Sequence, residues 1–157
     1  MPLNRDVIGR TYRTEGTFEV TREHIRRFAD AIADPNPVYR DPAAARALGH
    51  PDVIAPPTFL TVLGFRFAGQ GPIIDPALGL NYARVVHGEQ RFVHHRPVRA
   101  GDVLTATSSV VDIRDAGSNE LMTTKMAITT TEGEPICDMF GTLVSRGTAA
   151  VTEGASA

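Results

Sequence analysis

The residues with the clearest chemical potential lie in one short turn, Asp34-Pro35-Asn36-Pro37-Val38-Tyr39. A carboxylate and a phenol at this spacing could take part in proton transfer. The phenol of Tyr39 ionises at about pH 10, however, so it is a poor general base at neutral pH and is better suited to donate a hydrogen bond. Structural roles compete with this chemistry. Asp34 can cap the turn through an Asx hydrogen bond, Asn36 can hold the turn, and Tyr39 is better explained as a packing or interface residue.

A second group of titratable side chains lies further along the chain. His87 and Glu89 are two residues apart in a predicted strand, so they should share one face and could form an acid–base couple. A sheet hydrogen bond or an interface contact is the favoured explanation of this pair. His94 and His95 are adjacent and should point to opposite faces, which prevents them from jointly holding a metal. The lone Cys137 lies between strand residues and is expected in the core. With no glycine-rich phosphate loop and no cluster of metal ligands, no cofactor is expected.

Composition narrows the class of protein. The 157 residues are 42% hydrophobic and 22% charged, which is ordinary for one globular domain. The net charge of −2 gives no reason to expect binding to nucleic acid or to an anionic membrane. A single cysteine excludes an internal disulfide, and neither a signal peptide nor an 18-residue apolar run is visible. We therefore expect a cytoplasmic protein.

Three helices are predicted around the turn. Thr21 is a plausible N-cap for a helix over residues 22–33, with Val20 and Ile25 placed to form a hydrophobic staple. Asp41 before Pro42 starts a second, short helix that Gly49 should end. The third helix, over residues 58–70, has almost no polar face. A helix that is apolar all round must be wrapped by other structure.

From about residue 80 the pattern changes to strands, at residues 84–86, 89–95, 103–114, 121–131 and 135–145. Long antiparallel strands after one apolar helix predict an α+β fold, in which a curved antiparallel β-sheet wraps around a long central helix. This is the hot-dog arrangement. Residues 1–146 should form this single domain, and residues 147–157 a disordered C-terminal tail. Because such a sheet exposes an edge, we expect a dimer.

The order of these elements and the segment FADAIADPNPVY resemble the MaoC-like (R)-specific hydratases and dehydratases. Their turn has the form Asp-x-Asn-Pro-[Ile/Val/Leu]-His. Asp34, Asn36, Pro37 and Val38 match it, whereas Tyr39 stands in the place of the histidine. The stretch RVVHGEQRFVHHRPVRAGDVL is also similar to a strand and turn of this family. NRDVIGRTYR and DPAAARALGHPDVIAPPTFLTVLGF resemble the FAS1-like dehydratase proteins in particular, which include dehydratase subunits that lack the motif histidine.

The resemblance implies water addition to, or removal from, a double bond beside a thioester, with aspartate and histidine sharing the proton transfers. It places Asp34, Asn36 and Tyr39 at the catalytic positions. Pro57 stands where the family has a glycine whose N–H polarises the thioester carbonyl, and Thr58 could supply an N–H one position later. Two parts of the machinery are thus missing. The implied role is a subunit of a (3R)-hydroxyacyl-ACP or -CoA dehydratase that binds substrate and stabilises a MaoC-like catalytic partner, as a heterodimer, or a homodimer in isolation. The implied substrate-binding residues are Pro57, Thr58, His87 and Glu89.

Three alternatives remain open. The chain could be a non-enzymatic scaffold that binds acyl thioesters. It could be an acyl thioesterase, which would need a carboxylate near the central helix, with Asp75 and Glu89 as candidates. It could also be a dehydratase without a partner, with His87 or Asp34 doing the work of the absent histidine.

Overall fold

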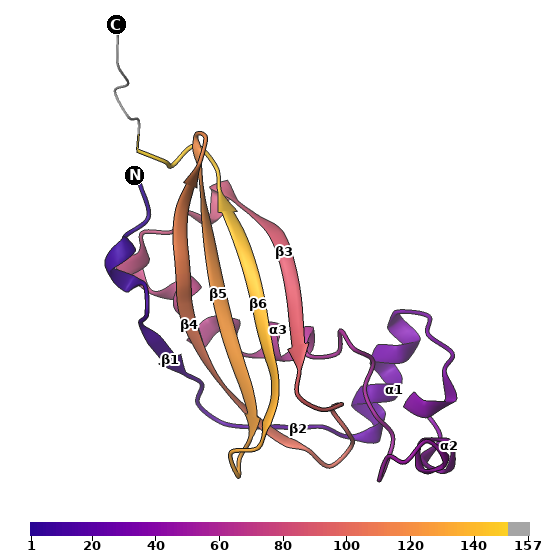
Figure 1. Cartoon of the computed structure of the whole chain (residues 1–157). Coiled ribbons are helices and arrows are strands. Elements are labelled where there is room, and N and C mark those ends of the chain that lie inside the picture. The colour runs from indigo at the N-terminus through magenta and orange to yellow at the C-terminus, as the bar shows by residue number, and fades with distance from the viewer. Residues whose placement is uncertain (151–157) are drawn as a thin grey trace, which may run out of the picture.

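The computed structural model describes residues 1–150, and its centre is one antiparallel sheet (Figure 1). The strands are β1 (Thr11–Arg13), β2 (Phe18–Glu19), β3 (Val85–His94), β4 (Val103–Ala116), β5 (Asn119–Thr130) and β6 (Pro135–Ser145). They lie in the order β1-β4-β5-β6-β3, and β2 also pairs with β4. Strand β3 pairs only with β6 in the described residues, so its other side is a free edge. The α+β fold class is confirmed.

The predicted strand pattern is confirmed with small shifts. The two predicted pieces at residues 84–86 and 89–95 form the single strand β3, and β6 has the predicted bounds. The turns that join β4 to β5 and β5 to β6 contain Gly117 and Gly133, with φ of 62° and 92°. Glycine is the residue that adopts this left-handed geometry without strain, and so these two turns could be found from the sequence.

The first two helices begin where their capping residues predict. Helix α1 (Arg22–Ala31) starts after Thr21, whose side chain accepts a hydrogen bond from the His24 N–H at 3.1 Å, and both staple residues are buried. Helix α2 (Pro42–Ala47) starts after Asp41, which accepts from the Ala43 N–H at 2.8 Å. Both helices lie beside the end of β3, away from the broad face of the sheet (Figure 1).

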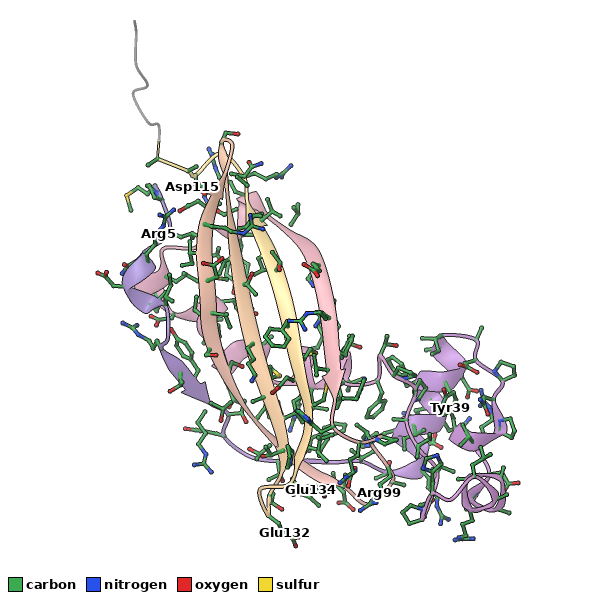
Figure 2. All side chains as sticks on the ribbon, viewed as in Figure 1. Arg5, Tyr39, Arg99, Asp115, Glu132 and Glu134 are labelled. Atoms are coloured by element: carbon green, nitrogen blue, oxygen red, sulfur yellow. The ribbon has the colours of Figure 1, made fainter. Side chains whose placement is uncertain are left out.

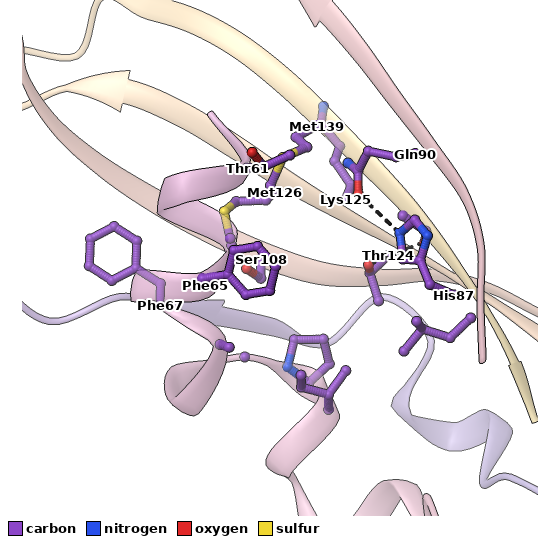
Figure 3. A pocket seen from close by; sticks show the side chains of 17 residues that line it. Thr61, Phe65, Phe67, His87, Gln90, Ser108, Thr124, Lys125, Met126 and Met139 are labelled. Atoms are coloured by element: carbon purple, nitrogen blue, oxygen red, sulfur yellow. Dashed lines mark hydrogen bonds between the residues drawn. The ribbon is translucent and has the colours of Figure 1, made fainter. Parts of the chain in front are cut away.

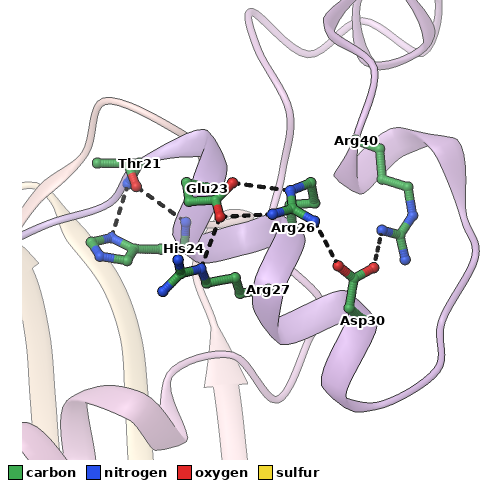
Figure 4. Close-up of polar contacts among 7 residues, drawn as sticks. All are labelled: Thr21, Glu23, His24, Arg26, Arg27, Asp30 and Arg40. Carbon is green, nitrogen blue, oxygen red and sulfur yellow. Dashed lines mark hydrogen bonds and ion pairs between the residues drawn. The ribbon is translucent and has the colours of Figure 1, made fainter.

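The outer face of α1 carries a chain of ion pairs (Figure 4). Glu23 contacts both Arg26 and Arg27, and these two cations lower the pKa of its carboxyl to about 2. Asp30 contacts Arg26 on its own helix and Arg40 from the segment that follows the Asp34–Tyr39 turn. Exposed pairs of this kind contribute little stability each. Their value here is geometric, because the Arg40 contact ties the turn to the helix before it.

The third helix is much shorter than predicted. Helix α3 runs only from Thr61 to Arg66, is preceded by a turn over residues 57–60 and is followed by the 3-10 helix η3 (Ala68–Gln70). The helix is not apolar and enclosed all round, as its sequence suggested, because the Phe65 side chain is 85% exposed. The buried side consists of Phe59, Leu60, Leu63 and Phe67. No helix within residues 1–150 is long and apolar enough to cross a membrane.

Two clusters of buried side chains form the core. The larger joins α1, the Asp34–Tyr39 turn, α3 and the inner face of the sheet, with Ile25, Tyr39, Phe59, Leu63 and Ile128 among its members. The smaller joins the N-terminal 3-10 helix η1 (Arg5–Val7) to β4 and β5 through Leu3, Val7, Leu78, Val110, Ile113 and Met122. Fully burying a side chain of this size stabilises the fold by about 1.5–3 kcal/mol. The packing around α3 therefore fixes where the adjoining turn lies.

The ordered chain continues past the predicted domain end at residue 146. The Gly147 N–H donates to Asn119 Oδ1 at 3.0 Å, the Thr148 hydroxyl donates to the Ser145 carbonyl at 3.1 Å, and the Ala149 N–H donates to the Ser118 carbonyl. These bonds hold the chain against the β4–β5 turn. The remainder of the predicted tail, residues 151–157, lies outside the described residues.

Arg96 joins the turn before β4 to the β5–β6 turn. Its guanidinium donates to Asp102 at 2.8 and 2.9 Å and to both oxygens of Glu134 at 2.8 Å. These carboxylates raise the pKa of Arg96, and the Asp102 side chain is only 6% exposed. Because the pair is partly shielded from water, it should contribute more than a surface pair.

We predict that Asp102→Ala lowers the free energy of unfolding by about 2–4 kcal/mol, since Arg96 loses one of its two carboxylate partners in a half-buried site. Chemical denaturation measures this change. The matched control is Asp115→Ala, whose exposed pair with Arg5 lies at the opposite end of the sheet from Glu134 (Figure 2). That substitution should cost less than about 1 kcal/mol. Equal losses from the two variants would contradict the structural role of Arg96.

Candidate functional site

Asp34 and Asn36 take part in two successive hydrogen-bonded turns. Asp34 Oδ1 accepts from the Asn36 N–H, and Asn36 Oδ1 accepts from the Val38 N–H, both at 3.0 Å. The second bond caps the 3-10 helix η2 (Pro37–Tyr39). The expected turn-holding roles of both residues are confirmed. That Asp34 and Asn36 correspond to catalytic residues of the family stays a prediction.

Tyr39 is buried in the main core, with 9% of its surface exposed, which agrees with the expected packing role. Burial, and then the nearby charge of Asp34, raise the pKa of the phenol above its usual value of 10. A raised phenol pKa keeps the proton on oxygen at neutral pH. The Tyr39 phenol is therefore unsuited to act as a base at neutral pH.

Tyr39 lines a hollow of about 390 Å³, which we call the Tyr39 cavity. Its other lining residues are Ile54, Ala55, Pro56, Pro57, His94, His95, Arg96, Pro97 and Val98. The motif turn, the segment leading into α3 and the end of β3 thus meet at one place, although they are far apart in the sequence.

His94 is the residue of this cavity that sequence reasoning missed. Its Nε2 donates to the Pro57 carbonyl at 2.9 Å, and its ring stacks on Phe92 with centroids 5.9 Å apart. His94 pairs with buried Cys137 across the ladder, so it occupies an inward-facing position of β3. His95 instead lies 3.5 Å from Asp138. Alternation from the partly buried Phe92 would have identified His94, but the run Phe92-Val93-His94-His95 does not show which residues face inward.

Pro57 and Thr58 are both exposed at the start of the turn into α3. Pro57 has no N–H, so it cannot polarise a carbonyl. The Thr58 carbonyl accepts from the Thr61 hydroxyl at 2.8 Å, whereas the Thr58 N–H donates to no acceptor among residues 1–150. The predicted substrate-binding role of these two residues stays a prediction.

A second hollow of about 260 Å³ lies between α3 and the inner face of the sheet, and we call it the helix–sheet cavity (Figure 3). Its walls are mainly apolar, with Phe65 and Phe67 on the helix side and Met126 and Met139 on the sheet side. Its polar lining residues include His87 and Gln90 on β3, where His87 Nε2 lies 3.2 Å from Gln90 Oε1. Gln90 Nε2 in turn donates to the Phe140 carbonyl at 2.9 Å, which fixes how the amide is oriented.

The predicted sharing of one strand face by His87 and Glu89 is wrong. His87 pairs with Leu143 while Glu89 pairs with Thr142, so Gly88 is an extra residue in a β-bulge. The bulge reverses the alternation, which places Gln90 beside His87 at the cavity and leaves Glu89 outside the cavity lining. The two residues therefore do not form the acid–base couple that a shared face would have allowed. Gly88 is the visible signal, because glycine inside a strand often marks a bulge.

The remaining candidates occupy structural positions. Asp75 accepts from Tyr12 at 2.7 Å, from Arg10 at 2.6 Å and from the Ala77 N–H at 2.8 Å, and these contacts lower its pKa. Cys137 is fully buried, as expected, and burial raises the pKa of its thiol to about 11. No group of three or more possible metal ligands occurs among residues 1–150.

Comparison with known proteins identifies the family of this chain. Residues 6–139 match the family described as "FAS1-like, dehydratase domain region". The chain belongs to this family. It is 52% identical over 157 residues to a UPF0336 protein of Saccharopolyspora erythraea, with both chains covered completely.

Two solved structures have a fold similar to that of this chain. The complex described as truncated HadBC, a (3R)-hydroxyacyl-ACP dehydratase of Mycobacterium tuberculosis, contains a chain with a TM-score of 0.77 and 30% identity, covering 88% of this chain and 97% of that one. A MaoC-like dehydratase from Rhodospirillum rubrum, at 17% identity, shows the same fold with a TM-score of 0.73, covering 96% of this chain and all of the other. The hot-dog fold and the resemblance to MaoC-like and FAS1-like dehydratases are thus confirmed.

The β-bulge leaves little room for a side chain at residue 88. A Cβ on Gly88 would lie 3.1 Å from Val144 Cγ2 and 3.4 Å from the Thr142 carbonyl oxygen. We predict that Gly88→Ala destabilises the protein by about 1–3 kcal/mol through overpacking, and disturbs the His87 and Gln90 side chains. Denaturation and side-chain NMR measure the two effects.

The matched control is Gly69→Ala, because a Cβ there meets nothing within 4 Å. Its stability should change by no more than about 0.5 kcal/mol. If Gly88→Ala were as stable as this control and left the His87 ring signals unmoved, the bulge would not be what positions His87.

Proposed function

We propose that this chain is the substrate-holding subunit of a (3R)-hydroxyacyl-thioester dehydratase, and that it works beside a MaoC-like catalytic subunit. The observation that carries the proposal is the motif turn. It keeps the hydrogen-bonded Asp34 and Asn36 of a dehydratase, but it presents a buried phenol at residue 39. The family match and the likeness to a dehydratase complex support it.

The chemistry explains why the turn favours holding over catalysis. Dehydration needs a group that takes the C2 proton and a group that protonates the leaving hydroxyl, and histidine suits both steps because its pKa lies near neutrality. Tyr39 has a raised pKa, so the phenol stays protonated near pH 7 and is a poor base. Pro57 adds a second defect, because it offers no N–H to the enolate oxygen that forms. Two independent losses favour an inactive site on this chain.

The helix–sheet cavity is the proposed place for the acyl chain. Its walls consist mainly of Phe65, Phe67, Met126, Met139 and Leu143, which suit a hydrocarbon. His87 and Gln90 of the edge strand β3 also line it, so the cavity reaches the free edge of the sheet. A chain bound there could extend toward a partner that pairs along β3.

The free edge and its surroundings suit pairing with another hot-dog subunit. Val86 and Val93 on β3 are 41% and 38% exposed, and Phe65 on α3 is 85% exposed. An unpaired strand beside apolar side chains is normally covered in the assembled protein. The proposed cover is a MaoC-like chain that has the histidine of the motif.

A thioesterase is the weaker alternative. Of its two candidate carboxylates, Asp75 is occupied by Arg10, Tyr12 and the Ala77 N–H. Glu89 lies outside the residues that line the helix–sheet cavity. Neither is placed to attack a thioester near α3. A scaffold that holds acyl thioesters without a catalytic partner remains the second candidate. The apolar helix–sheet cavity supports it, because binding an acyl chain there needs no catalytic group.

The test compares the chain alone with a co-expressed complex that contains a MaoC-like protein with the intact motif. Alone, the chain should not hydrate crotonyl-CoA or longer enoyl thioesters. The complex should turn over long-chain substrates at least about tenfold faster than the partner alone, equivalent to about 1.4 kcal/mol of transition-state stabilisation. Free thiol release is measured in parallel.

The variant Gly141→Val tests whether the helix–sheet cavity holds the acyl chain. A Cβ at residue 141 lies at ordinary contact distance from Thr124 Oγ1 and Gln90 Oε1, so it fits. The two further methyl groups of valine would occupy cavity space. It should shorten the longest acyl chain that the complex accepts, while Gly69→Ala leaves the range unchanged. If the complex turns over long-chain substrates no faster than the partner alone, the scaffold function is supported. Release of free thiol by the chain alone would support a thioesterase.

A further inference from the structure

A glycine between two polar side chains leaves a gap in the sheet wall of the helix–sheet cavity. Gln90, Gly141 and Thr124 are directly paired across β3, β6 and β5, and all three line the cavity. A Cβ on Gly141 would lie 3.6 Å from Thr124 Oγ1 and 3.7 Å from Gln90 Oε1. Apart from the residues next to it in the chain, it would meet no other atom of residues 1–150 within 4 Å. We call this space the Gly141 notch, and two oxygens border it.

The Gln90 amide presents its oxygen to the notch (Figure 3). Its Nε2 donates to the Phe140 carbonyl at 2.9 Å, so Oε1 is the amide atom that lies near Gly141. Because this oxygen can only accept, the 3.2 Å contact with His87 places a proton on His87 Nε2. An amide oxygen has two lone pairs, and the contact with His87 uses one of them. Gln90 therefore has one acceptor position left for a ligand.

Thr124 supplies a hydroxyl that is only weakly bonded within the protein. Its Oγ1 donates to the Gly141 carbonyl at 3.3 Å, which is longer than the usual range of about 2.5–3.0 Å for an O–H···O bond. A hydroxyl hydrogen rotates to suit its surroundings, so a ligand in the notch could take this hydrogen in place of the carbonyl. The notch thus presents one acceptor, Gln90 Oε1, and one hydroxyl that can donate.

The charges around the cavity favour a neutral ligand group. Lys125 is among the lining residues, but its ammonium lies 3.1 Å from Asp138, which does not line the cavity. In the described part of the chain, the lining contains no arginine, aspartate or glutamate. A carboxylate would therefore find no lysine or arginine free to pair with it, and the Gln90 oxygen would repel it.

We propose that the Gly141 notch binds a hydroxyl group on the hydrocarbon part of an acyl chain. A hydroxyl can donate to Gln90 Oε1 and accept from Thr124 Oγ1 at the same time. A ketone or an ether only accepts, and would leave the Gln90 oxygen without a donor. This inference rests on the proposed function, because it takes the helix–sheet cavity as the site of the acyl chain. The substrate class becomes acyl thioesters with a second hydroxyl, further along the chain than the one removed at C3.

The surroundings of the notch explain why an unsubstituted chain should bind less well. Met139 and Leu143 lie two residues before and after Gly141 on the same strand and also line the cavity. A plain hydrocarbon seated on this wall would remove water from the two notch oxygens and give them no hydrogen bond in return. Desolvation of a polar group without a new partner costs binding free energy. A hydroxyl at the matching carbon avoids this cost.

The experiment measures the binding of acyl-CoA thioesters of one chain length to the full chain by isothermal titration calorimetry. The acyl chains are unsubstituted, or carry a single hydroxyl or a single ketone at successive carbons beyond C3. At the matching carbon, the hydroxyl should strengthen binding by about tenfold over the unsubstituted chain, which corresponds to one well-placed hydrogen bond. The ketone should give no gain at any carbon.

Three variants test whether the preference arises at the notch. Gly141→Ala should abolish it, because its Cβ fits at ordinary contact distance and fills the space. Thr124→Val keeps the branched shape without the hydroxyl, and should reduce the preference to about twofold or less. The matched control is Thr123→Val, the next residue on β5, whose hydroxyl lies 3.4 Å from Thr142 Oγ1 and which does not line the cavity. This control should keep the tenfold preference.

Three results would overturn the inference. Equal affinities for hydroxylated, ketone-bearing and unsubstituted chains would show that the notch holds only water. Failure of all these thioesters to bind would show that the cavity takes no acyl chain. A hydroxyl preference that survives both Gly141→Ala and Thr124→Val would place the hydroxyl elsewhere in the protein.

Failure of this inference and failure of the proposed function are distinguishable. A complex that accelerates long-chain turnover, in which the chain shows no preference for a hydroxyl, would reject this inference and leave the proposed function standing. A hydroxyl preference that depends on Gly141, in a chain that gives its partner no gain in turnover, would reject the proposed function and leave the notch as a binding site.

Discussion

The structure depends on the one-sided burial of α3 and the turn before it against the sheet. Phe59, Leu60, Leu63 and Phe67 are almost completely enclosed, and each contributes on the order of 1.5–3 kcal/mol by leaving water. This packing fixes the segment that contains Pro57, which forms one wall of the Tyr39 cavity. Thr61, Gly64 and Phe65 of α3 line the helix–sheet cavity, and Phe65 is also largely exposed. A single packed contact therefore positions both candidate sites.

Much of the fold could be predicted from local chemistry. Thr21 and Asp41 start their helices because their side chains accept backbone N–H groups, and Gly117 and Gly133 make tight turns because they accept positive φ. These signals act within a few residues, so one sequence suffices to read them. The length of α3 could not be read this way. Apolar residues at 58–70 suit either a long buried helix or a short helix with a covered face, and tertiary packing decides between them.

In the candidate site too, contacts between near neighbours in the sequence could be predicted, and contacts between distant residues could not. The Asp34 and Asn36 turns are local, and their roles followed from the sequence. The contact of His94 with Pro57 joins residues 37 positions apart, which no periodicity reveals. The His87 and Glu89 prediction failed for a related reason. Strict alternation assumes an unbroken ladder, and one inserted residue at Gly88 reverses every face that follows.

Residue 39 decides what the Asp34–Tyr39 turn can do chemically. The turn is capped by its own side chains and is braced by the contact from Arg40 to Asp30. Tyr39 is a phenol whose raised pKa keeps the proton on oxygen at neutral pH. In the proposed function, the chain contributes binding surface and a pairing edge, and proton transfer is assigned to a partner.

The most direct test of that account restores the two missing parts in the isolated chain. The double variant Tyr39→His with Pro57→Gly, checked for folding by circular dichroism, is assayed for hydration of crotonyl-CoA beside the wild type. The account predicts no turnover by the wild type and measurable turnover by the double variant. Wild-type hydration at the same rate would contradict the claim that this turn has lost proton transfer. A folded double variant without activity would contradict the claim that residues 39 and 57 are what the turn lacks.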